Sequence, residues 1–108
     1  MIEICTENFE DEIIRSQGMV LLEFTAQWCG VCRSVERLVD TVGHEIPDVK
    51  FCFADVDKNP ELARKFSVRG VPTFIVFDEG ELRSRKAGAL TKRDLYEMLG
   101  RKPHGIRV

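Results

Sequence analysis

The sequence predicts an α/β domain with a central mixed five-stranded sheet and helices on both faces, in the order β-α-β-α-β-α-β-β-α. Two observations predict it. Through about residue 70, strand-like apolar runs alternate with segments whose apolar side chains recur at helical spacing, which favours parallel strands joined by crossover helices. After residue 72, two strand-like runs are separated only by a tight turn, which favours an antiparallel hairpin before a last helix.

The chain is expected to begin with a short edge strand, because residues 2–5 alternate between polar and apolar side chains. A helix follows, capped by the side chain of Thr6 or Asn8 and ended by Gly18. Its apolar stripe comprises Phe9, Ile13 and Ile14.

Two cysteines, Cys29 and Cys32, stand between a strand and a helix. Residues 19–25 (MVLLEFT) form an apolar, partly β-branched run typical of a buried strand, and residues 35–42 have apolar positions at helical spacing. The pair is therefore expected where the strand ends, with Cys29 near the helix N-cap and Cys32 one turn in.

That position favours thiol chemistry, because a helix N-terminus has unpaired N–H groups and the positive end of the helix dipole. Since a thiolate is the attacking species in disulfide exchange, we expect Cys29 to be the low-pKa nucleophile and Cys32 the more buried resolving thiol. Trp28 would cover the site and limit water, and Gly30 would let another backbone approach closely. The alternative is a structural pair of buried cysteines.

The middle of the chain supplies the third strand, at residues 49–54, and a short helix after it. Asn59 is expected to cap this helix, with Pro60 at its first position. Residues 67–70 form the loop that follows.

The last part contains a hairpin of residues 73–77 and 82–86, and then a helix capped by Thr91 and ended by Gly100. The second hairpin strand is expected at an exposed edge, because it is rich in basic side chains. The inward side chains of the helix are expected to be Leu95, Met98 and Leu99.

The chain is expected to fold as one domain over residues 1–108, with a core of residues 1–100 and a short basic tail at 101–108. A net charge of −2, with both signs interspersed, argues against binding to nucleic acid or to an anionic membrane. Residues 19–22, the longest apolar run near the start, are too few for a membrane span or a signal peptide. We expect a cytoplasmic monomer, since thiols stay reduced there and a CxxC is more often catalytic than structural.

The other cysteines, Cys5 and Cys52, stand alone and are interpreted as small core residues rather than a second redox pair. A four-cysteine zinc site would need a second closely spaced pair, and His44 and His104 are isolated. We therefore expect no metal, and the absence of a nucleotide-binding fingerprint predicts no bound cofactor.

Four segments carry a resemblance to a known family: residues 28–33 (WCGVCR), 57–60 (DKNP), 70–74 (GVPTF) and 88–90 (GAL). In this order and spacing they resemble the thioredoxin family over nearly the whole chain. The resemblance implies the same fold, and a thiol–disulfide oxidoreductase that reduces protein disulfides through Cys29 and Cys32.

Glu23 is a carboxylate within an apolar strand, six residues before Cys29. It either points to solvent from an exposed face or is buried near the cysteines, and a central strand covered on both faces favours burial. The thioredoxin family places a buried aspartate at the matching position, where it accepts a proton from the inner cysteine. The resemblance therefore implies that Glu23 is the proton acceptor for Cys32.

The resemblance also implies a second limb of the site at Val71, Pro72 and Thr73, with a cis Val71–Pro72 bond against the CxxC. The Val71 backbone would pair with an extended substrate segment, and Gly88 would line the same groove. The substrate-binding residues expected on this basis are Trp28, Gly30, Val31, Val71, Pro72, Thr73 and Gly88.

Three residues depart from the usual pattern of the family. Val31 replaces a proline between the cysteines, and its N–H is expected to add a hydrogen bond to the Cys29 thiolate. Arg37 replaces a proline that kinks the following helix, so a straighter helix is expected. Phe53 replaces a lysine that pairs with the buried carboxylate, which removes a charge partner from Glu23.

The leading hypothesis is a reductase of protein disulfides, which the resemblance implies is re-reduced by a flavin-dependent thioredoxin reductase using NADPH. The alternative is a non-catalytic docking module on the same scaffold. The intact CxxC, Trp28 and Pro72 argue against that alternative. An oxidant or isomerase of exported proteins fits less well, because no export signal is found.

Overall fold

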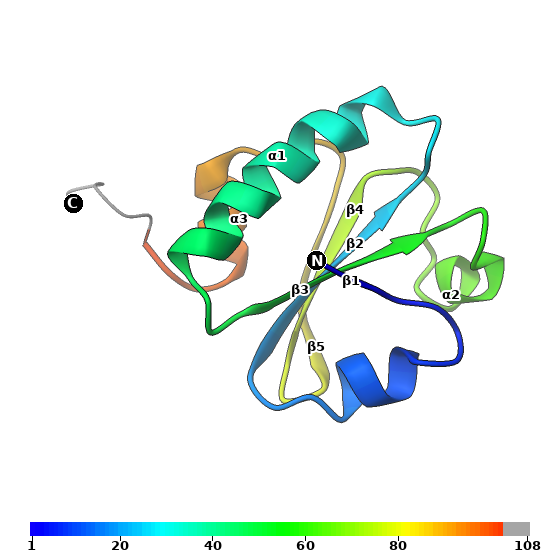
Figure 1. The fold of residues 1–108 in the computed structure, drawn as a ribbon, viewed down its shortest axis with the longest axis horizontal. Helices are drawn as coiled ribbons and strands as arrows, with labels where there is room; N and C mark the ends of the chain where they lie inside the picture. Colours follow the sequence, from blue (N-terminus) through cyan, green and yellow to red (C-terminus); the bar gives the residue numbers. More distant parts are fainter. Residues whose placement is uncertain (103–108) are drawn as a thin grey trace.

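A five-stranded mixed sheet forms the middle layer of the computed structural model, which describes residues 1–102 (Figure 1). The spatial order of the strands is β1-β3-β2-β4-β5. β2 is parallel to β3 and antiparallel to β4, so the predicted mixed sheet is confirmed. The strands are β1 (Ile2–Glu3), β2 (Met19–Thr25), β3 (Lys50–Asp55), β4 (Thr73–Asp78) and β5 (Glu81–Ala87).

Helical segments cover both faces of the sheet, as predicted (Figure 1). α1 (Gly30–Glu45) and α3 (Lys92–Met98) lie on one face, and α2 (Pro60–Lys65) and the short π-helical segment η1 (Glu10–Ile14) lie on the other. α1 is one unbroken α-helix through Arg37.

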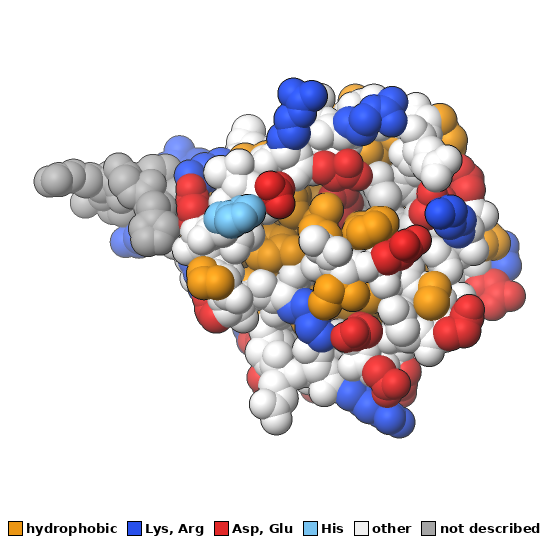
Figure 2. Space-filling model, in the orientation of Figure 1, with side chains coloured by type: hydrophobic (Ala, Val, Ile, Leu, Met, Phe, Trp, Pro, Cys, Tyr) orange, Lys and Arg blue, Asp and Glu red, His pale blue; other side chains and the backbone are white. Residues whose placement is uncertain are grey.

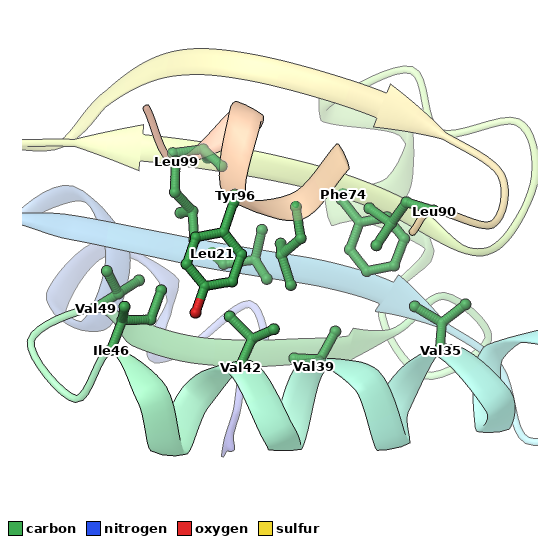
Figure 3. Packing of buried hydrophobic residues seen from close by; sticks show 12 residues of the cluster. Leu21, Val35, Val39, Val42, Ile46, Val49, Phe74, Leu90, Tyr96 and Leu99 are labelled. Carbon is green, nitrogen blue, oxygen red and sulfur yellow. The ribbon is translucent and has the colours of Figure 1, made fainter. Parts of the chain in front are cut away.

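The core between the sheet and α1 and α3 is built from aliphatic side chains on α1 that point toward the strands (Figure 3). Val35, Val39 and Val42 lie along this face of α1 and are buried. Tyr96 of α3, which the sequence analysis did not name among the inward residues, is almost fully buried in the same cluster and donates its hydroxyl hydrogen to Glu45.

Side chains of β2 alternate between the two cores. Leu22 and Phe24 belong to the cluster beneath η1 and α2, and Leu21 belongs to the cluster beneath α1 and α3. Because alternate residues of a strand point to the same face, Glu23 lies on the side of Leu21 and faces α1. The register of β2 therefore directs this carboxylate toward the helix that begins with the cysteines.

The predicted cap of the first helix is wrong. This segment is only five residues long, and Phe9 occupies its N-cap position without a side-chain hydrogen bond. Asn8 instead accepts a hydrogen bond from the N–H of Cys5 (2.8 Å) and donates one to the carbonyl oxygen of Glu3 (3.0 Å). The amide thus closes the turn after β1, which is why β1 ends at Glu3 rather than at residue 5.

Asn59 stands at the N-cap of α2 with Pro60 at the first position, as predicted, but its side chain does not cap the helix. Its amide nitrogen donates to the carbonyl oxygens of Asp55 (3.1 Å) and Ile4 (3.4 Å). The side chain joins the end of β3 to the segment after β1 instead.

The end of the described chain is held to the body of the domain. Thr91 caps α3 through a capping box with Asp94, and Gly100 follows that helix with a φ of +68°, as the sequence predicts. Arg101 pairs bidentately with Asp48, with one nitrogen–oxygen distance of 2.9 Å, so the folded part extends through Arg101. Residues 103–108 of the expected tail, which include His104, lie outside the described residues.

The hairpin between β4 and β5 depends on Gly80, and we expect Gly80→Ala to destabilise the domain more than Gly18→Ala. Both glycines have positive φ, +81° and +76°, so each substitution should cost about 1–3 kcal/mol for the backbone conformation alone. A Cβ at Gly80 would also overlap the carbonyl oxygen of Ile14, whereas one at Gly18 meets no atom within 4 Å. The additional loss in free energy of unfolding, about 1–3 kcal/mol, is measured by urea denaturation, and equal losses in the two variants would contradict it.

Candidate active site

The two cysteines lie at the junction of β2 and α1, as predicted, and are joined by a disulfide with their Cα atoms 5.3 Å apart. Cys29 is the N-cap of α1 and has extended backbone angles, with φ −90° and ψ 104°. Its Sγ accepts a hydrogen bond of 3.1 Å from the backbone N–H of Cys32. A sulfur at this position lies at the positive end of the α1 dipole.

In this oxidised form the N–H that reaches the sulfur belongs to Cys32. The bond from the Val31 N–H to the thiolate concerns the reduced form and stays a prediction. An N-cap side chain accepts from the second or third helical residue, and here the third is aligned. Val31 and Gly30 are exposed instead, and a Cβ on Gly30 would meet no atom within 4 Å. This side of the disulfide is therefore open to a partner.

The loop before β4 forms the second part of the site. The Val71–Pro72 peptide bond is cis, and the carbonyl oxygen of Val71 lies 3.9 Å from Sγ of Cys29. Thr73 is buried and donates its hydroxyl hydrogen to the carbonyl oxygen of Gly70 (2.7 Å). The exposed Gly88 donates its N–H to the carbonyl oxygen of Pro72 (2.8 Å) at a φ of +90°, which favours glycine.

The side chain of Trp28, which the sequence analysis expected to cover the site, is 69 % exposed. Its indole N–H donates to a carboxylate oxygen of Asp57 (2.8 Å), which fixes the ring at the rim of a shallow groove. This groove, of about 120 Å³, is lined by Trp28, Val56, Val68, Arg69, Gly70 and Val71. Ala26, Val56 and Val71 pack with the two cysteines in one apolar cluster.

Glu23 is fully buried, which removes the alternative of a solvent-facing side chain. Its register partners on the two neighbouring strands are Phe53 and Phe74, so apolar rings flank it on both sides. Within residues 1–102, neither carboxylate oxygen has a hydrogen-bond partner. Burial, and then the negative charge of Glu36, raises the pKa of Glu23 to about 8.

Comparison with known proteins identifies the family. The model of the thioredoxin family matches residues 1–101. The chain belongs to the thioredoxin family. It is 31 % identical over 100 residues to a thioredoxin of Pseudomonas aeruginosa, covering 92 % of this chain and 93 % of that protein. It is also 33 % identical to a thioredoxin of Rhodospirillum rubrum (90 % and 94 % covered) and 32 % identical to one of Chlamydia trachomatis (94 % and 98 %).

Family membership and the Cys29–Cys32 pair together make the chain a thiol–disulfide oxidoreductase, as the sequence analysis predicted. For a thioredoxin-family protein the general partners are protein disulfides and a reductase. No helix in the described part of the chain is long and apolar enough to cross a membrane.

The structure adds residues that the sequence analysis did not assign to this thioredoxin-family site. Asp57 anchors Trp28, and Val68 and Arg69 line the groove beside it. Glu36 could have been found from helical spacing, because it lies four residues after Cys32 on α1. Val68 and Arg69 carried no signal, since they come from a loop whose approach to Trp28 depends on the tertiary fold.

The two remaining cysteines are free thiols, and neither belongs to the cluster around Cys29 and Cys32. Cys52 is fully buried in the core beneath η1 and α2, and burial raises the pKa of its thiol to about 12. A thiol that stays protonated at neutral pH is a poor nucleophile, in keeping with the core role expected for Cys52. Cys5 is half-buried and is also a free thiol.

Proposed function

We propose that Cys29 is the nucleophile that attacks a substrate disulfide and that Cys32 is the resolving thiol. The observation that supports this order is the position of Cys29 as the N-cap of α1, where its sulfur accepts the N–H of Cys32. Both the hydrogen bond and the dipole stabilise a thiolate at Cys29. Cys32 is fully buried, whereas Cys29 retains 6 % exposure next to the open side of the site.

Glu23 accepts the proton of Cys32 in this scheme. Proton transfer is efficient when donor and acceptor have similar pKa values, and a free thiol titrates at about 8.5. The pKa of about 8 that burial gives Glu23 matches that value. An ordinary exposed glutamate would be too weak a base for the same step.

The substrate lies as an extended segment across the groove beside the disulfide. The carbonyl group of Val71 next to Cys29 offers a strand-like hydrogen bond, and the exposed Gly88 leaves room for the backbone of the segment. Trp28, Gly30 and Val31 contact the segment from the other side. Pro72 and Thr73 are buried, and they hold the loop in the shape that presents Val71.

The partners in this scheme are disulfide-containing proteins and a flavin-dependent reductase that uses NADPH. The protein acts as a cytoplasmic monomer, formed by residues 1–108 as one domain, and carries two electrons at a time from the reductase to its substrates. Turnover of a protein disulfide with dithiothreitol as the reductant tests the catalytic role, because a docking module would not accelerate the reaction.

Alkylation of the reduced protein tests which thiol is the nucleophile. With iodoacetamide at pH 6–7, Cys29 should be modified faster than Cys32, because only the thiolate reacts and only Cys29 has a sulfur that is both stabilised and accessible. Mass spectrometry of peptides gives the order, with Cys52 as the internal control that should stay unmodified. Faster labelling of Cys32 would reverse the two roles.

A further inference from the structure

Glu36 is a second carboxylate beside the buried Glu23. It lies on α1, one helical turn beyond Cys32, and its side chain is half-buried. Thr25 lies two residues after Glu23 on β2, so the two side chains share the face of the sheet that α1 covers. The hydroxyl of Thr25 donates to a carboxylate oxygen of Glu36 at 3.3 Å.

Glu36 and Thr25 also line a hollow that reaches solvent. It has a volume of about 450 Å³ and lies between the start of α1, the end of β3 and β1, with Glu3, Phe53 and Asp55 also in its wall. Figure 2 shows hydrophobic side chains in the middle of the surface below α1, with acidic and basic side chains around them. Glu23 itself has no exposed surface and does not line this hollow, whereas Thr25, on the same face of β2, and Glu36 do.

Several charged groups surround this hollow and the adjoining one, which Glu36 also lines. They are Glu3 of β1, Arg33, Arg37 and Asp40 of α1, Asp55 of β3, Lys58 beyond β3, and the amino end of the chain at Met1. Charges of both signs are present around the two hollows.

We propose that Glu36 is a positioning residue for the dithiol chemistry: together with Thr25 it connects Glu23 to the hollow and takes on the proton that Glu23 receives from Cys32. The inference rests on the role proposed for Glu23. A fully buried carboxyl group without a hydrogen-bond partner needs a polar neighbour to return its proton to water, and Glu36 is the carboxylate whose charge acts on it.

Attack of Cys32 on the mixed disulfide conserves atoms and electrons. Cys32 gives its proton to Glu23, its thiolate forms a bond to the sulfur of Cys29, and the bond between Cys29 and the substrate sulfur breaks. The electron pair leaves on the substrate sulfur, which takes a proton from solvent, so the dithiol is oxidised and the substrate reduced. Glu23 then passes its proton to Glu36, and Glu36 passes it to water in the hollow.

The test is the pH profile of the second step, measured as release of a thiol from a preformed mixed disulfide on Cys29 in single turnover. Glu36→Gln should lower the plateau rate at high pH by about threefold to tenfold, less than the roughly 10²–10⁴-fold effect of a directly acting acid or base. Its inflection should also move to lower pH, because a like charge beside Glu23 is lost. Formate should restore rate to Glu36→Ala, since the small carboxylate can enter the hollow.

Asp40→Asn is the matched control, because it removes the same charge from α1 one turn further on, without contact to Thr25. An unchanged plateau in Glu36→Gln would overturn the relay, whether or not the inflection moves, and so would an equal loss in Asp40→Asn. Glu23→Gln, measured in the same assay, separates the two proposals. If it slows the second step while Glu36→Gln does not, only the relay fails; if it has no effect, the role of Glu23 fails as well.

Discussion

Replacing Cys29 with serine should abolish disulfide reduction, whereas replacing Cys32 with serine should leave the first attack intact and halt the reaction at the mixed disulfide. The physical reason lies in the start of α1, where only the sulfur of Cys29 receives an N–H and the positive end of the dipole. A serine hydroxyl at this position cannot replace the thiolate as the nucleophile in disulfide exchange.

The two variants are compared by single turnover against a peptide disulfide, with the products separated by mass. Cys29→Ser should yield no adduct, and Cys32→Ser should accumulate one adduct per chain at close to the wild-type rate of attack. Cys52→Ser serves as the control and should retain full turnover, because Cys52 lies in the other core. An adduct on Cys32 in the Cys29→Ser protein would contradict the assignment. The adducts held by Cys32→Ser would also identify the substrates in a cell extract.

The order of strands and helices could be predicted from the sequence because periodicity and turn residues record it directly. The apolar run of β2, the hairpin at Gly80 and the cap at Thr91 are all local signals, and all three agree with the structure. The cap of the first helix was mispredicted because the side chain of Asn8 can form either of two sets of hydrogen bonds. Its amide can cap a helix or close a turn, and the contact with Glu3 that decides between them depends on the end of β1.

The active site, too, could be predicted from the sequence only in part. The N-cap position of Cys29 follows from the sequence, since a strand ends and a helix begins within a few residues of it. The orientation of Trp28 does not, because it depends on Asp57, a residue 29 positions away that forms the hydrogen bond to the ring. Burial of Glu23 could be favoured but not decided, since only the register with Phe53 and Phe74 places apolar rings on both sides of it.

Glu23 should also make the oxidised protein less stable as the pH rises from 5 to 8. Its pKa is about 8 in the folded protein and close to the ordinary 4.5 in the unfolded chain. Folding therefore binds a proton over this window, and the free energy of unfolding falls with pH until the folded pKa is passed. Since one pKa unit corresponds to about 1.4 kcal/mol, the loss at pH 7 is of the order of 3 kcal/mol.

Two substitutions isolate the loss of stability that ionisation of Glu23 causes. Glu23→Gln cannot ionise, so its stability should lack the fall between pH 5 and 8, and it should exceed the wild type at neutral pH. Glu23→Leu should be more stable still at each pH, because it also removes buried polar atoms that have no partner in the described structure. Glu7→Gln, at an exposed position before η1, is the control and should follow the wild type.

The measurement is guanidinium denaturation of the oxidised proteins from pH 5 to pH 9, with the rate of mixed-disulfide release measured alongside in the reduced state. Both Glu23 variants should gain stability at pH 7 and lose rate in the second step, because the same burial that destabilises the carboxylate makes it a base strong enough for a thiol. Opposite signs in stability and rate distinguish this cause from general damage to the fold, which would lower both. Stability curves that run parallel in the wild type and both variants across this pH range would show that Glu23 titrates at an ordinary pKa, and its role as the proton acceptor would then lose its physical basis.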